Sequence, residues 1–182
     1  RVSFYTLGCK VNQFDTQGLA ERFRRHGHEV VGFQSKADVY IINTCTVTKT
    51  AEQKARQMIR RVKREHPGAV VVVTGCYPQT DPKAVEGLPE ADLIIGVAGR
   101  SGLVEIVQQF VTRTGPRIAV EPWRSEADFE VYEPEFSEKT RAFLKIEDGC
   151  DAYCSYCRIP FARGPVRSLP PARVISEIKR LR

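Results

Sequence analysis

The stretch that decides the fold is AVVVVTGC, residues 69–76. Its unbroken run of valines is typical of a strand covered on both faces, as the strands of parallel sheets are. Similar apolar segments lie at 1–9, 37–45 and 91–96. A segment with helical periodicity follows each of these three. This alternation predicts an α/β fold with a doubly wound parallel sheet in a domain of residues 1–112. We expect Asn12 or Thr16 to cap the first helix and Gly27 to end it.

The chain changes character after this predicted sheet. Residues 113–140 are rich in acids, glycine and proline, which indicates an inter-domain linker with one strand at RIAVE, 117–121. A new strand is then predicted at residues 141–150, RAFLKIEDGC. A new helix with Pro171 in its first turn is predicted at residues 169–182, LPPARVISEIKRLR. A strand, a loop and a helix make one β/α unit, so residues 141–182 are expected to begin a second domain of a longer protein.

Charge and apolar patterning limit the functional classes. The formal net charge is +6, and basic residues gather in two stretches, at 48–66 and 150–182. These stretches favour a phosphate-rich partner, although solvated helix faces would explain them equally well. No apolar run reaches about 18 residues, so we expect no membrane span. Six cysteines without an export signal indicate a reducing compartment, the cytoplasm.

Three of the cysteines each follow a predicted strand directly: Cys9 in TLGC, Cys45 in INTC and Cys76 in VTGC. The carboxyl ends of parallel strands meet at one edge of the sheet, so these thiols are expected to converge there on a metal or a cluster. Gly8 and Gly75 would let the backbone approach such a group closely. The alternative is three buried structural cysteines.

The other three cysteines, Cys150, Cys154 and Cys157, lie in one short loop. Four cysteines would complete a [4Fe–4S] cluster, whereas three leave one iron open, and that iron can bind the amino and carboxylate groups of S-adenosylmethionine. The alternatives are a zinc site completed elsewhere and a redox thiol pair formed by Cys154 and Cys157.

Both cysteine sets together resemble a known family. The pattern C-x-x-x-C-x-aromatic-C resembles radical S-adenosylmethionine enzymes, and KIEDGCDAYCSYCRIPFARGPVRS, 145–168, resembles the methylthiotransferases among them. TLGCKVNQFDT, NTCTV and VTGC resemble the amino-terminal domain of the same enzymes. The resemblance covers essentially the whole chain. It implies that residues 141–182 are the first β/α unit of a truncated radical S-adenosylmethionine partial barrel.

The resemblance also implies cofactors and roles. Cys150, Cys154 and Cys157 would bind the [4Fe–4S] cluster at which S-adenosylmethionine is cleaved, with Tyr156 against its adenine, although ordinary loop packing would also explain Tyr156. Cys9, Cys45 and Cys76 would bind an auxiliary [4Fe–4S] cluster that carries the sulfur, and Asn12 would steady the Cys9 loop. No acid–base catalytic residue is identified. The following arginines are expected to contact RNA or the cofactor carboxylate, unless they are surface residues beside a turn: Arg158, Arg163 and Arg167.

The LGCKVNQFDT string most resembles the branch that adds a methylthio group to C2 of N6-threonylcarbamoyladenosine in tRNA. The sister branches act on isopentenyladenosine or on a ribosomal-protein aspartate. Such an enzyme needs tRNA, an electron donor and a sulfur donor, and the sequence identifies neither donor. A fragment without the rest of the barrel and the RNA-binding domain is expected to be inactive. The non-enzymatic alternatives are an iron–sulfur electron carrier and a zinc-dependent nucleic-acid-binding module.

Overall fold

A computed structural model describes residues 1–112, 115, 117–124, 129–132 and 142–181. The first part contains β1 (Val2–Thr6), α1 (Lys10–Arg25), β2 (Val30–Val31), β3 (Val39–Thr44), α2 (Lys49–Glu65), β4 (Val70–Gly75), α3 (Cys76–Thr80), α4 (Pro82–Glu86), β5 (Leu93–Ile95), the 3-10 turn η1 (Arg100–Gly102), α5 (Leu103–Val111) and β6 (Ile118–Ala119). The second contains β7 (Glu147–Asp148), α6 (Ile159–Arg163), β8 (Arg167–Ser168) and α7 (Pro171–Arg180).

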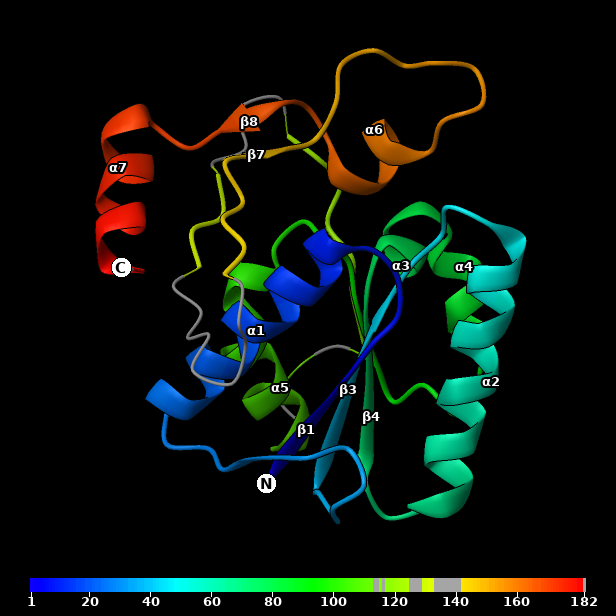
Figure 1. Ribbon diagram of the computed structural model, residues 1–182. Coiled ribbons are helices and arrows are strands. Elements are labelled where there is room, and N and C mark those ends of the chain that lie inside the picture. The colour runs from blue at the N-terminus through cyan, green and yellow to red at the C-terminus, as the bar shows by residue number, and fades with distance from the viewer. Residues whose placement is uncertain (113–114, 116, 125–128, 133–141, 182) are drawn as a thin grey trace.

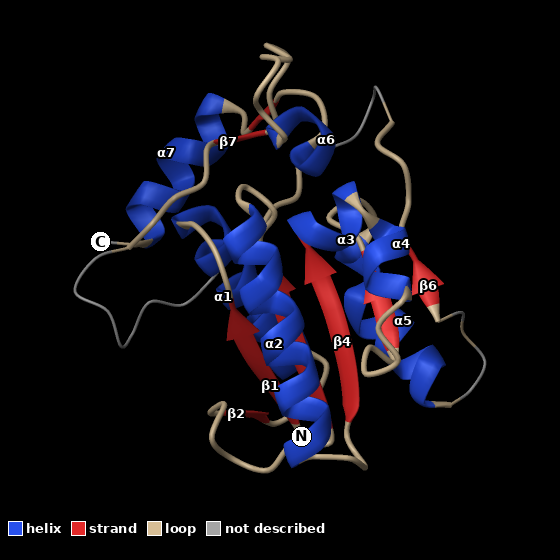
Figure 2. Ribbon diagram, turned by 90° about the vertical axis from the view of Figure 1, so that its right-hand side faces the viewer, coloured by secondary structure: helices blue, strands red, loops and turns tan. Residues whose placement is uncertain are grey.

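The large sheet has the strand order β2-β1-β3-β4-β5-β6, and every neighbouring pair is parallel. Alternate valines of β4 serve opposite faces. Val71 and Val73 pack with α2 and α4, whereas Val72 packs with α1 and α5. Figure 2 shows helices on both faces of the strands. The predicted α/β fold with a doubly wound parallel sheet is confirmed, because a strand apolar on both sides requires cover on both sides.

The start of α1 differs from the prediction. The helix begins at Lys10 with Cys9 at the N-cap position, so Asn12 and Thr16 lie inside it and cap nothing. Both side chains are instead buried: the Asn12 amide donates to the backbone oxygens of Leu7 and Thr44 at the strand ends, and the Thr16 hydroxyl donates to the backbone oxygen of Asn12. Gly27 does follow the helix end with a φ of 80°, as expected of a C′ glycine.

Residues 141–182 form a strand, a loop and a helix in the expected order, with two differences. The strand predicted over 141–150 is only β7, Glu147–Asp148, and its partner among the described strands is the antiparallel β8. The short helix α6 was not expected, whereas α7 begins at Pro171 as predicted. The expected strand at 117–121 is β6. Most of the predicted linker, 113–140, lies outside the described residues, so both domain boundaries remain predictions.

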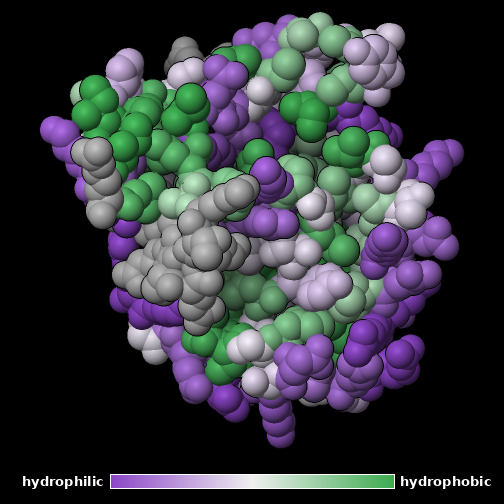
Figure 3. All heavy atoms as spheres, viewed as in Figure 1, coloured by the Kyte–Doolittle hydropathy of each residue, from purple (hydrophilic) through white to green (hydrophobic). Residues whose placement is uncertain are grey.

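The second part lies over the end of the sheet at which Cys9, Cys45 and Cys76 are found. Figure 1 shows β7, β8 and α6 above the first turns of α1 and α3, opposite the chain's amino terminus. The apolar residues Ile175 and Ile178 of α7 are half-exposed, and Figure 3 shows hydrophobic side chains gathered in that region. Among the described helices, none is both long and apolar enough to cross a membrane.

Candidate functional site

The first cysteine set meets at one edge of the sheet. Cys9 follows β1, Cys45 follows β3 and Cys76 opens α3 directly after β4, and these three strands are neighbours in the sheet. Cys45 and Cys76 are buried, whereas Cys9 is exposed. The three segments therefore end at the same edge, because neighbouring parallel strands end side by side, and the convergence of the thiols on a metal or a cluster stays a prediction.

Two glycines allow this close approach. Gly8 has a φ of 118°, and a Cβ placed on it would lie 3.3 Å from the Cys45 thiol sulfur. Gly75 has a φ of 102°, and its Cβ would lie 2.5 Å from the Thr44 carbonyl oxygen. Any other residue would be strained at these angles and would push the cysteine-bearing turns apart.

Asn12 links the turns that carry these thiols. Its amide nitrogen donates to the backbone oxygens of Leu7, at 2.9 Å, and Thr44, at 3.0 Å. Its amide oxygen lies 3.8 Å from the Cys9 sulfur and 4.0 Å from the Cys76 sulfur. The bond to Leu7 agrees with the suggestion that Asn12 steadies the Cys9 loop. Asn12 also contacts the segments of Thr44 and Cys76, which the sequence did not suggest.

The second cysteine set lies on a loop closed by backbone hydrogen bonds. The amide of Cys150 donates to the Gly164 oxygen at 3.1 Å, and the amide of Cys157 donates to the Cys154 oxygen at 2.9 Å. Cys154 is exposed, and Cys150 and Cys157 are partly exposed. Tyr156 is 88% exposed, so its ring is not used for loop packing and is free to contact a ligand.

A cavity of about 370 Å³ lies beside the second cysteine loop, and of the six cysteines Cys157 lines it. One wall comes from Thr80, the last residue of the helix that Cys76 opens, and the other from the second cysteine loop. Its lining residues are Thr80, Ser155, Tyr156, Cys157, Arg158 and Phe161.

Thiols are donor atoms that an iron–sulfur cluster or a zinc ion would use. Among the described residues, no group of three or more His, Cys, Asp or Glu side chains is close enough to hold one metal ion. A cubane cluster takes each thiolate at a different iron, so its ligands stand further apart than those of a single ion. Six free thiols in two sets of three fit that donor chemistry.

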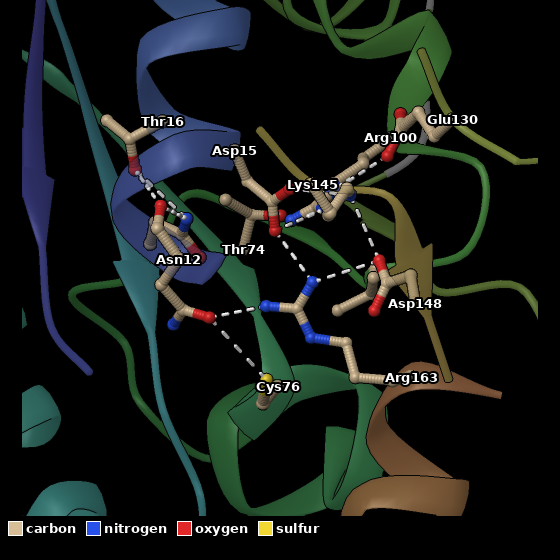
Figure 4. A network of polar contacts seen from close by, with 12 residues as sticks. Asn12, Asp15, Thr16, Thr74, Cys76, Arg100, Glu130, Lys145, Asp148 and Arg163 are labelled. Atoms are coloured by element: carbon tan, nitrogen blue, oxygen red, sulfur yellow. Dashed lines mark hydrogen bonds and ion pairs between the residues drawn. The ribbon is translucent and has the colours of Figure 1, made fainter. Parts of the chain in front are cut away.

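A buried network of charges joins the two parts of the chain (Figure 4). At its centre, the fully buried carboxylate of Asp15 on α1 forms ion pairs with Arg100 at 2.7 Å, Arg163 at 2.6 Å and Lys145 at 2.8 Å. Asp148 is the second acceptor, 3.0 Å from Lys145 and 3.3 Å from Arg163. The remaining members are Glu130, 3.0 Å from Arg100, and Arg167, 3.8 Å from Asp148.

The charges of this network determine its protonation. Burial raises the pKa of the Asp15 carboxyl, but the cations Arg100, Arg163 and Lys145 outweigh burial and hold that pKa well below its ordinary value. The pKa of Asp148 is lowered for the same reason, with Arg163 and Lys145 opposing burial. Both carboxylates therefore stay ionised, and the network is made of full charges.

The three arginines predicted to contact RNA or cofactor are all engaged within the chain. Arg158 is exposed and donates to Glu52 at 3.1 Å and Thr46 at 3.3 Å. Arg163 is buried in the network, and Arg167 is buried with its guanidinium 4.4 Å from the centre of the Trp123 ring. Contact with RNA remains a prediction, and of these three Arg158 alone has the exposure for it.

Sequence reasoning missed Asp15, Arg100, Lys145 and Asp148. One signal was available: Asp15, Leu19 and Phe23 are spaced by four residues, so they share the buried face of α1. A carboxylate on such a stripe needs a buried partner. The partners themselves could not be found from the sequence, because they lie 85, 130 and 148 positions away (100−15, 145−15 and 163−15).

Comparison with known proteins adds a family. Residues 1–96 match the family described as "Uncharacterized protein family UPF0004". A "Threonylcarbamoyladenosine tRNA methylthiotransferase MtaB" from Aquifex aeolicus is 41% identical over the whole chain and 44% of its own length. The enzyme of that name from Bacillus subtilis is 41% identical over 99% of the chain and 40% of its own length. A "tRNA-2-methylthio-N(6)-dimethylallyladenosine synthase" from Clostridium novyi is 32% identical over 97% of the chain and 40% of its own length. The chain thus spans about two fifths of these relatives.

Proposed function

This chain belongs to the UPF0004 family, and from that premise we propose that it forms part of a tRNA methylthiotransferase that uses two [4Fe–4S] clusters and S-adenosylmethionine. One observation carries the proposal: the segment with the second three-cysteine set lies over the end of the sheet at which Cys9, Cys45 and Cys76 follow their strands (Figure 1). When bound, the clusters and S-adenosylmethionine would supply the radical chemistry and the sulfur that protein side chains cannot.

The residues of the chain hold and enclose these groups. Cys150, Cys154 and Cys157 would bind one cluster and leave one coordination position for S-adenosylmethionine, and Tyr156 is exposed beside it for the adenine. The second cluster would be bound by Cys9, Cys45 and Cys76, with Asn12 keeping two of their segments together. Such a site supplies position and partial shielding from water rather than acid–base groups.

The substrate class follows from relatives and charge. The relatives at 41% identity are named for threonylcarbamoyladenosine, and that for dimethylallyladenosine is at 32%. We therefore propose C2 of N6-threonylcarbamoyladenosine in tRNA as the target. The helix α2 supports an RNA partner, because its exposed side carries basic residues that suit a phosphate backbone. These residues are Lys49, Lys54, Arg60, Arg61 and Arg64.

The metal content tests the cofactor proposal. Anaerobic reconstitution of the protein is expected to yield about eight iron and about eight sulfide per chain, four of each for every cluster. A variant with Cys9, Cys45 and Cys76 replaced by Ala is expected to retain about half of each. Metal analysis and absorption spectra would measure both. Stoichiometric zinc without iron in the parent protein would refute the proposal and support the zinc-dependent module.

Nucleoside analysis tests the substrate. Deleting the gene is expected to remove 2-methylthio-N6-threonylcarbamoyladenosine from cellular tRNA and to leave its unmodified precursor. Mass spectrometry of digested tRNA measures both nucleosides, and re-expression of the gene is the control. Persistence of that nucleoside, with loss of the isopentenyl counterpart or of a ribosomal-protein modification, would assign the chain to a sister branch.

A further inference from the structure

Arg163 connects the two cysteine-bearing segments. It is the last residue of α6, which follows the second cysteine loop, and it is 4% exposed. One guanidinium nitrogen is held by Asp15 at 2.6 Å and Asp148 at 3.3 Å. The other terminal nitrogen donates to the amide oxygen of Asn12 (Figure 4). The Arg163 guanidinium, which belongs to the segment of the second cysteine set, thus contacts Asn12 beside the first cysteine set.

Asn12 lies between Arg163 and the thiols of the first cysteine set. The amide oxygen that accepts from Arg163 is the same atom that lies within 4.0 Å of the sulfurs of Cys9 and Cys76. Because arginine can only donate, this contact requires the oxygen end of the Asn12 amide to face Arg163 and the sulfurs, and the carbonyls of Leu7 and Thr44 require the same orientation of its nitrogen end. Arg163 therefore supports the orientation of Asn12 and places a positive charge next to the oxygen that faces Cys76.

The network around Arg163 does not neutralise this charge completely. Its cations are Arg100, Lys145, Arg163 and Arg167, whereas its carboxylates are Asp15, Asp148 and Glu130. Among the described residues of the network, cations thus exceed carboxylates by one. Screening is weak inside the protein, so a surplus charge acts over a longer distance there than at the surface.

Building on the proposed function, we propose that Arg163 is a positioning residue for the first cysteine set. It orients Asn12 and raises the reduction potential of the cluster that Cys9, Cys45 and Cys76 would hold. Cluster potentials depend on net charge and on hydrogen bonds around the sulfurs, and a nearby cation favours the reduced, more negative form. Since Arg163 lies on the second segment, the potential of the first cluster depends on the docking of that segment.

Redox titration of the full-length protein tests this inference. The parent protein would carry Ala at Cys150, Cys154 and Cys157, so that the remaining cluster is the first one. In this parent, Arg163→Met is expected to shift the midpoint potential to more negative values, because the cation is lost. Asp148→Asn is expected to shift it to more positive values, because a carboxylate is lost. Arg163→Lys keeps the charge and is expected to restore most of the parent potential. Electron paramagnetic resonance would follow the cluster in each titration.

Arg24→Met is the control. Arg24 lies in the last turn of α1, at the opposite end of that helix from Cys9, and its side chain is 53% exposed and pairs with Glu21, so its loss is expected to leave the potential unchanged. Equal potentials in the parent and Arg163→Met, at equal iron content, would overturn this inference and leave the proposed function intact. If Arg163→Met binds no cluster, an unchanged potential in Asp148→Asn would overturn it. A parent that binds no iron–sulfur cluster would instead overturn the proposed function.

Discussion

Replacing Cys9, Cys45 and Cys76 together by Ala in the full-length protein is expected to abolish methylthio transfer to tRNA while S-adenosylmethionine cleavage stays detectable. The physical reason is the separation of the two sets. Cys9, Cys45 and Cys76 lie at strand ends, whereas Cys150, Cys154 and Cys157 lie on their own hydrogen-bonded loop. Loss of the first set therefore leaves the backbone of the second loop supported.

The matched variant replaces Cys150, Cys154 and Cys157 by Ala and is expected to lose both cleavage and transfer. Quantifying 5′-deoxyadenosine measures cleavage, and mass spectrometry of tRNA nucleosides measures transfer. Circular dichroism would establish that both variants are folded. Equal loss of cleavage in the two folded variants would show that S-adenosylmethionine cleavage does not depend on the second cysteine set alone.

Asp15→Asn is expected to lower the free energy of unfolding by about 3–5 kcal/mol, the range for a buried ion pair that loses one partner. Three cations would keep their buried positions without their shared carboxylate: Arg100, Lys145 and Arg163. Asparagine keeps the shape of aspartate, so the loss measures the charge and not a cavity. Urea unfolding followed by circular dichroism would give the difference.

The control for this variant is Glu65→Gln, which removes a carboxylate from the surface pair with Arg61. Both members of that pair are about half-exposed, so we expect a change of about 0.5 kcal/mol or less. A similar small change in Asp15→Asn would mean that the buried network contributes little to stability.

The same carboxylate predicts a dependence on pH. The folded-state pKa of Asp15 lies well below its ordinary value of 3.8, so the folded protein releases this proton more readily than the unfolded chain. The stabilisation is then fully present above about pH 4 and is lost as the pH falls further toward the folded pKa. Stability of the wild type should decrease in this range more steeply than that of Asp15→Asn.

Much of the fold was accessible from local pattern. The valine run at 70–73 predicted a strand buried on both sides, and β4 has that environment. Alternation of strands and helices predicted the parallel sheet, and the sheet order then follows ordinary doubly wound topology. The place of Cys9, Cys45 and Cys76 was predictable because each lies at or shortly after the end of a strand, and parallel strands share one carboxyl edge.

Element ends were less accessible. Asn12 resembles a helix cap in the sequence, yet it lies inside α1 because two strand-end carbonyls, of Leu7 and Thr44, satisfy its amide better than the helix start would. The strand expected at 141–150 is short because, within the described part of the chain, its backbone finds only the two residues of β8 to pair with. Both outcomes depend on neighbours that local propensity does not specify.

The sequence by itself determined the sheet, its two covered faces and the two cysteine sets, because periodicity and strand-end position are local properties of the chain. Only the tertiary structure decided which charges are buried. Arg158, Arg163 and Arg167 look alike as basic residues after a cysteine loop, but the first is exposed and the other two are buried. Arg163 is buried because Asp15 and Asn12, 148 and 151 positions away, meet it at the sheet edge. Burial of a charge depends on partners brought together by folding, and no local pattern records that distance.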